Sequence, residues 1–387
     1  MVYVTIKQPP MYHQMSIEEF LFSDDIPKNV IVTENTSNTR TDAYFQISDK
    51  LRRAVSIPTL LTPLIRFNKD TEHLRSVPRK SLYREFYLPK KSGGLRRIDA
   101  PNDELMDALR RLKRIFENDF HALYHTSAFA YIKKRSTVDA VKRHQSNESK
   151  WFAKLDLSNF FGSTTLDFVM KMFSMIYPFS EVVKFKASDG TPMGENELRK
   201  ALELAFLDGG LPQGTPISPL ITNIMMIPVD YTLNKGFRDL NHQKYIYTRY
   251  ADDFIISSRY HFAVKDVENY ITSVLHGFEA PFAIKPEKTR YGSASGRNWN
   301  LGIMLNKDNE MTVGRKRKKE LQTMLANYIM DSKSGVRWDK TDVQVMDGYR
   351  CYYRMIEGDT IDRIVAHING KFNVDVVKMI RADLRAA

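Results

Sequence analysis

The stretch YTRYADDFIIS, residues 247–257, places two acidic residues in the middle of an apolar and aromatic run. The residues on both sides of Asp252 and Asp253 favour β-strands, whereas aspartate is a poor strand former. A carboxylate that is buried or held in a cleft must be paired, hydrogen-bonded or bound to a cation. We therefore expect a hairpin of two strands with a functional pair of acids at its tip.

A third acid ends another apolar stretch, because KWFAKLDLSNFF, residues 150–161, places Asp156 after alternating apolar residues. Clustered carboxylates repel one another unless a cation neutralises them. If the two strands are neighbours, Asp156 and Asp252 can hold two Mg²⁺ ions about 4 Å apart, the arrangement of two-metal phosphoryl transfer. The adjacent Asp24 and Asp25 precede Pro27 and need no role beyond a turn or helix start.

The charge of the chain favours a polyanionic partner. The 387 residues carry a formal net charge of +12, with a pI near 9.4, which suits a protein that lies along a phosphate backbone. Cys351 is the single cysteine, so no disulfide forms within the chain, and we expect it in the core. No signal peptide and no apolar run of membrane-spanning length is present, which predicts a cytoplasmic protein.

The periodicity of apolar residues predicts an α+β architecture in which helices and short antiparallel strands are interspersed. We expect one hairpin over 81–101 and another over 298–315, turning at 307–309. A helix over 46–66 should be broken by Pro58 and Pro63. The other predicted helices follow residue 102, span 216–237 as one long helix, and make up most of the basic tail from Arg315.

Seven sequence blocks in a fixed order carry a family resemblance: LRRIDAP (95–101), AFAYIKKRSTVDAVKRH (128–144), LDLSNFF (155–161), LPQGTPISPLITNI (211–224), YADD (250–253), KPEKT (285–289) and NWNLGIML (298–305). Together they resemble reverse transcriptases of the bacterial non-LTR branch, which includes group II intron, retron and defence-associated enzymes. The resemblance implies a right-hand polymerase. It would comprise an N-terminal extension (1–80), fingers and palm with an antiparallel sheet (81–312), and a helical thumb (313–387).

The resemblance implies that Asp156 and Asp252 are the main metal ligands, that Asp253 assists, and that the backbone carbonyl of Leu157 contributes. The cofactor would be two Mg²⁺ ions, with Mn²⁺ as a substitute. RNA template, a DNA or RNA primer, and dNTPs would be the partners, together with a dedicated noncoding RNA.

The resemblance also implies a nucleotide site. Phe161 would pack against the sugar and exclude a 2′-hydroxyl, and Gln213 would contact the nucleotide nearby. Arg96, with Arg97 beside it on the opposite side of the strand, would bind the triphosphate, since a guanidinium grips phosphate oxygens in two places. Lys288 would lie near the leaving pyrophosphate, where it could donate a proton or offset charge.

Template and primer contacts are implied for two further segments. Trp299, Leu301 and Gly302 would form the hairpin that supports the primer end. The run Arg315, Lys316, Arg317, Lys318 and Lys319 would meet the backbone of the template–primer duplex.

Other functions remain open at the level of sequence. An RNA polymerase that copies RNA shares the same metals, although Phe161 argues against it. A protein-primed or template-independent polymerase and a catalytically silent RNA-binding scaffold are further alternatives, but the latter has no need of three costly acids. DAVKRH at 139–144 and NLG at 300–302 depart from two short marks of retron enzymes. The outline therefore favours a domesticated bacterial enzyme in retron-like or antiphage defence.

Overall fold

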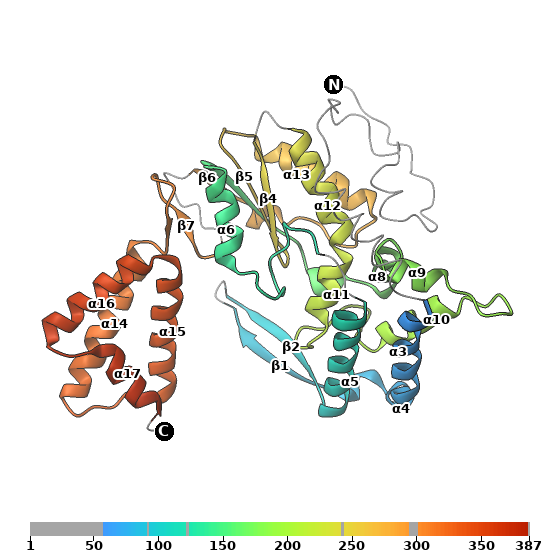
Figure 1. Cartoon of the computed structure of the whole chain (residues 1–387), viewed down its shortest axis with the longest axis horizontal. Helices are drawn as coiled ribbons and strands as arrows, with labels where there is room; N and C mark the ends of the chain where they lie inside the picture. The colour runs from blue at the N-terminus through green and yellow to red at the C-terminus, as the bar shows by residue number, and fades with distance from the viewer. Residues whose placement is uncertain (1–56, 91–92, 121–123, 241–243, 294–300, 386–387) are drawn as a thin grey trace. The chain divides into compact units, whose positions relative to one another are not determined.

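Helices and short antiparallel strands alternate along the chain (Figure 1), which confirms the predicted α+β class. The computed structural model describes residues 57–90, 93–120, 124–240, 244–293 and 301–385. These residues form two compact units. The first takes the described residues up to Arg135 together with Ala153–Ile256 and Phe262–Arg290, and the second takes Ser136–Phe152, Ser257–His261 and the described residues from Tyr291.

Three small sheets are formed by the described strands. The largest has the order β4-β5-β3-β6, with β4 at Ile246–Tyr250, β5 at Asp253–Ser258, β3 at Trp151–Asp156 and β6 at Arg290–Ser293. A separate antiparallel hairpin pairs β1 (Tyr83–Pro89) with β2 (Leu95–Pro101). The third sheet pairs β7 (Met304–Leu305) with β8 (Met311–Thr312). The hairpins predicted over 81–101 and 298–315 are thus confirmed within the described residues.

Helices of the first unit contribute many of its buried hydrophobic residues. They are α3 (Ile57–Asp70), α4 (Glu72–Arg75), α5 (Asp103–Arg114), α7 (Phe160–Ser163), α8 (Leu166–Phe173), α9 (Phe179–Lys184), α10 (Met193–Glu203), α11 (Ser218–Met225), α12 (Ile227–Asp239) and α13 (Val264–Gly277). Short turns of 3-10 helix lie at η1 (Arg79–Leu82) and η4 (Pro286–Lys288), and the π-helical turn η2 (Ile115–Asp119) extends α5.

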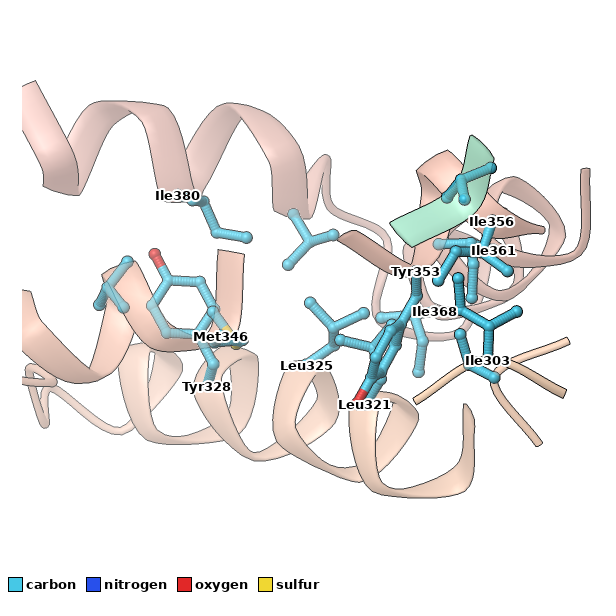
Figure 2. Packing of buried hydrophobic residues seen from close by; sticks show 14 of the residues in the cluster. Ile303, Leu321, Leu325, Tyr328, Met346, Tyr353, Ile356, Ile361, Ile368 and Ile380 are labelled. Atoms are coloured by element: carbon cyan, nitrogen blue, oxygen red, sulfur yellow. The ribbon is translucent and has the colours of Figure 1, made fainter. Parts of the chain in front are cut away.

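The second unit is mainly helical, as the tail predicted. It contains α6 (Thr137–Ser146), α14 (Arg315–Lys333), α15 (Lys340–Ile356), α16 (Gly358–Phe372) and α17 (Val376–Arg385). Leu321, Leu325 and Tyr328 recur at helical spacing on one face of α14 and belong to the core of this unit. Figure 2 shows Tyr328 beside Ile380 of α17, whereas Leu321 lies toward the end of the cluster that holds Ile303. The Tyr328 hydroxyl donates to the Asp383 carboxylate at 2.7 Å, so the same face is also held by a polar contact.

Three expectations from the sequence were wrong. Helix α3 continues through Pro63 and is not broken there. The expected single helix over 216–237 is divided into α11 and α12 at Met226, because Pro228 lacks the amide hydrogen that would continue the helix. Cys351 is exposed on α15 and does not belong to the core.

The three-part division at 80 and 312 stays a prediction, and residues 1–56 of its N-terminal extension lie outside the described residues. None of the helices that the structure describes is both long and apolar enough to span a membrane.

Candidate active site

The acidic hairpin forms as the sequence predicts. Strand β4 ends at Tyr250, Asp253 begins β5, and Asp252 lies in the turn between them. Ala251 adopts a left-handed backbone conformation with φ of 57°, which is uncommon for a residue other than glycine. The chain therefore turns sharply just before the two acids.

Asp156 lies at the end of β3, the strand next to β5 in the sheet. The backbone amide of Leu157 donates to the carbonyl of Asp252 at 3.1 Å, which ties the two acidic segments together. The predicted adjacency of these strands is confirmed, so residues almost a hundred positions apart in sequence meet at one edge of the sheet.

The carboxylates of Asp252 and Asp253 bring negative charge into a partly buried site. Burial raises the pKa of Asp252, and repulsion from Asp253 and Asp156 adds to the rise. Burial also raises the pKa of Asp253, although the nearby Lys154 ammonium offsets part of that rise. Both carboxyls thus favour an additional positive charge beside them.

Two lysines supply positive charge at the acids. Lys288 donates to Asp156 at 2.9 Å, and this hydrogen bond raises the pKa of the lysine. Lys154 lies 2.7 Å from the Asp253 carboxylate. The sequence reasoning named Lys288 but missed Lys154. Strand alternation was the available signal for Lys154, because residues 154 and 156 of one strand face the same side of the sheet.

The donors present fit Mg²⁺. Within the described residues no group of three or more histidine, cysteine or acidic side chains is arranged to hold a metal ion. Magnesium is nevertheless commonly bound by one or two carboxylates together with substrate phosphates and water. Asp156 and Asp252 supply two such carboxylates, and Asp253 is engaged by Lys154.

The two phenylalanines after Asp156 point to different places. Phe160 is 3% exposed and packs on Phe282, whereas Phe161 is only half-buried. The Phe161 carbonyl accepts the backbone amide of Leu211 at 2.9 Å, and a Cβ on Gly210 would collide with the backbone of Gly162. This close contact sets the LPQG loop directly against the segment that carries Phe161.

The same loop contacts strand β2. The Gln213 carbonyl accepts the amide of Asp99 at 2.7 Å. Gly214 has a φ of 124°, and a Cβ there would meet the Asp99 carbonyl at 2.8 Å, so only glycine allows the approach. Strand β2 thereby brings Arg96 and Arg97 into the same part of the first unit as Gln213.

The two arginines have different surroundings. Arg97 contacts the carboxylates of Asp99 at 2.7 Å and Glu85 at 3.1 Å. Arg96 is exposed and forms no ion pair with any residue that the structure describes. Arg96 is therefore the one with its guanidinium available for an anion.

The second unit holds the remaining predicted contacts, except that Trp299 lies outside the described residues. The Gly302 carbonyl accepts from the Arg317 guanidinium, and Lys318 pairs with Glu357 at 3.0 Å. The other three side chains of the basic run are exposed: Arg315, Lys316 and Lys319. Helix geometry thus divides the run into an inward pair and an outward group.

A buried ion pair behind the hairpin was missed by the sequence reasoning. Arg249 is 1% exposed and contacts Asp230 of α12 through two nitrogens, at 2.8 and 2.7 Å. It also donates to the Ala251 carbonyl at 3.2 Å, and Tyr247 donates to Asp230 at 2.7 Å. A charged residue in each of two apolar elements was the available signal.

Comparison with known proteins identifies the family of the chain. The sequence profile of the reverse transcriptase (RNA-dependent DNA polymerase) family matches residues 88–337. The retron Ec73 reverse transcriptase of Escherichia coli is 27% identical over 273 residues, which cover 70% of this chain and 82% of that protein. The retron Ec83 reverse transcriptase of Escherichia coli is 25% identical over 309 residues, covering 77% and 89%.

Among solved structures, telomerase from Candida albicans in complex with a fragment of telomeric RNA has a TM-score of 0.45 and 9% identity, covering 77% of this chain and 66% of that one. The family assignment rests on the profile and the retron enzymes. Since the profile covers more than half of the residues, the chain belongs to the reverse transcriptase family and is an RNA-directed DNA polymerase.

Proposed function

We propose that this reverse transcriptase extends a primer with dNTPs by two-metal-ion nucleotidyl transfer, with Asp156 and Asp252 as the principal ligands. Asp253 assists, and the Leu157 carbonyl completes the set. The observation that carries the proposal is the meeting of Asp156 and Asp252 at adjoining strand ends, where burial and mutual repulsion raise the pKa of Asp252. Bound Mg²⁺ would neutralise charge on the attacking and leaving oxygens.

The chain's own residues would orient the nucleotide. Arg96 is exposed and without an ion pair among the described residues, which suits it to the triphosphate. Arg97 is restrained by Asp99 and Glu85 and would hold the strand in place. Phe161 and Gln213 lie on two segments joined through the Leu211 amide, so they would line the sugar together.

Lys288 would change partner during the reaction. Its ammonium is held by Asp156 at 2.9 Å, and a cation bound to that carboxylate would compete with it. The released lysine, half exposed, could then reach the leaving pyrophosphate, where it offsets charge or donates a proton.

The test of the metal site is cation binding measured apart from catalysis. Mn²⁺ binding, followed by electron paramagnetic resonance in the presence of a dNTP, should be at least about tenfold weaker in Asp156→Asn and Asp252→Asn. Asp266→Asn, an exposed aspartate on α13, serves as the matched control and should bind as wild type does. Equal Mn²⁺ binding by all four proteins would refute the ligand assignment.

We also propose a retron-like role in which the enzyme holds a dedicated noncoding RNA and serves antiphage defence. The support is the similarity to two retron reverse transcriptases over more than four fifths of their length. Sequencing of the nucleic acid that copurifies with the protein tests this role. One enriched RNA species, with DNA copied from it, is expected. A broad sample of cellular RNA would contradict a dedicated template.

A further inference from the structure

A groove of about 460 Å³ lies in the first unit between α3 and the end of α5, two helices that run beside each other in Figure 1. Its volume is within the range of small-ligand sites. Both helices and the π-helical turn η2 contribute to its lining, which consists of Thr62, Pro63, Arg66, Phe67, Arg111, Arg114, Ile115, Asn118 and Asp119. None of these residues belongs to the polymerase site described above.

Two irregularities of the helices meet at the groove. Pro63 lies inside α3, where it removes one backbone hydrogen bond. On the facing side, η2 replaces the last α-helical turn with a wider π turn over Ile115–Asp119. Such turns are rare and frequently occur at functional sites. This one brings Asn118 to the same wall as Arg111 and Arg114.

The groove has an excess of positive charge. Arg111 is fixed, because it pairs with Asp70 at 2.5 Å and lies over the Phe67 ring. Arg66 and Arg114 are exposed, and neither guanidinium forms a hydrogen bond or ion pair with the residues that the structure describes. Asp119 is the single acid of the lining. Arg111 and Arg114 lie in the last turn of α5, where a cation also interacts favourably with the helix dipole. Arg66 lies before the last turn of α3, so the dipole does not account for its position.

We propose that this groove binds a backbone phosphate of RNA, away from the polymerase site. A guanidinium presents two parallel donors that match phosphate oxygens, and Arg66 and Arg114 face a common space from opposite helices. A phosphate between them would relieve their mutual repulsion, while the fixed Arg111 and the apolar floor at Phe67 shape the site. The inference rests on RNA being a partner of the enzyme.

The chain offers a matched pair of variants. R66A/R114A removes the two unpaired groove arginines, whereas K69A/R110A removes two exposed cations from the same helices outside the groove. Affinity for a labelled RNA hairpin with single-stranded flanks is measured by fluorescence anisotropy over a series of salt concentrations. R66A/R114A should bind about tenfold more weakly than wild type and lower the slope of log affinity against log salt by about 1.4–1.8, and K69A/R110A should do neither.

A chemical measurement identifies the source of the phosphate. Phenylglyoxal modification of each arginine is followed by mass spectrometry, with RNA, ATP or inorganic phosphate added. Protection of Arg66 and Arg114 by RNA, but not of Arg110, is expected. Stronger protection by ATP or by inorganic phosphate would overturn the assignment to RNA, and equal loss of RNA affinity in both double variants would overturn the site itself. Primer extension by the wild-type enzyme is scored separately, so a failed groove leaves the polymerase proposal standing.

Discussion

At the scale of single residues, the ionisation of Asp252 affects both the proposed metal site and the stability of the fold. Its pKa is raised in the folded protein above the ordinary value of 3.8. The folded state therefore holds the proton more tightly than the unfolded state. The cost of ionising Asp252 begins as pH rises past the unfolded value and is complete above the folded one. At neutral pH and without a divalent cation, this carboxylate destabilises the fold.

Asp252→Asn should abolish DNA synthesis while leaving RNA affinity almost unchanged, because the proposed role of this carboxylate is to bind metal and not phosphate. The variant should also melt about 1–3 °C higher than wild type at pH 7 in a chelator. Differential scanning fluorimetry checks the shift, which should vanish below about pH 4. Wild type should gain stability on addition of Mg²⁺ and the variant should gain less. A variant that melts lower than wild type in a chelator would contradict the assigned charge.

Phe161→Ala should admit ribonucleotides, because the half-buried ring would no longer exclude a 2′-hydroxyl. We expect the ratio of rNTP to dNTP incorporation to rise about tenfold or more. Single-nucleotide extension with each substrate measures it. Phe161→Tyr keeps the bulk of the ring and is the control. An unchanged ratio in Phe161→Ala would leave Phe161 as a packing residue only.

Arg249→Ala should lower the free energy of unfolding by about 3–5 kcal/mol, since it leaves the fully buried Asp230 without a cation beside it. Urea denaturation measures the loss. The triple variant R249M/D230L/Y247F removes the ion pair and the tyrosine hydroxyl bonded to it, and it should recover most of that stability. A loss below about 1 kcal/mol in Arg249→Ala would show that the pair contributes little.

At the scale of secondary-structure elements, the basic run of α14 divides into exposed cations proposed to contact RNA and cations that stabilise the fold. The triple variant R315A/K316A/K319A changes only exposed side chains, so it should weaken RNA binding and reduce the salt slope by about 2–3. Its unfolding free energy should change by less than about 0.5 kcal/mol.

The matched variant R317A/K318A should behave in the opposite way. It removes the contact to the Gly302 carbonyl and the Lys318–Glu357 pair, so it should lose thermal stability more than RNA affinity. Anisotropy and thermal melting of both variants check the pair of expectations. Identical behaviour would mean that the helix faces do not divide the charges as described.

The elements that the sequence predicted correctly are those that depend on local signals. Hairpins and the acidic strand ends were predictable because strand formation and turns are local signals, and each candidate catalytic acid interrupts an apolar run. The continuation of α3 through Pro63 could not be predicted from local signals, because packing of the buried face of this helix outweighs the lost hydrogen bond. Strand alternation places Lys154 on the same face as Asp156, but its contact with Asp253 also depends on which strands become neighbours, and that is not a local signal.

At the scale of the whole molecule, the two units show a division that linear boundaries do not follow. The chain enters the second unit three times, at Ser136–Phe152, at Ser257–His261 and from Tyr291 onward, and it returns to the first unit in between. Every described residue proposed to act on metal or nucleotide belongs to the first unit, and the basic helix α14 belongs to the second. The net charge of +12 suits an enzyme that acts on nucleic acid, whereas the proposed chemistry needs only a few acids.

The most direct measurement is primer extension on an RNA template annealed to a DNA primer, with Mg²⁺ and labelled dNTPs. The wild-type enzyme is compared with the Asp252→Asn/Asp253→Asn double variant, and binding of the template–primer is confirmed for both. We predict full-length DNA from the wild type and none from the variant. DNA synthesis by the variant would contradict the proposed polymerase site. So would a wild-type enzyme that binds the template–primer but incorporates none of the four dNTPs.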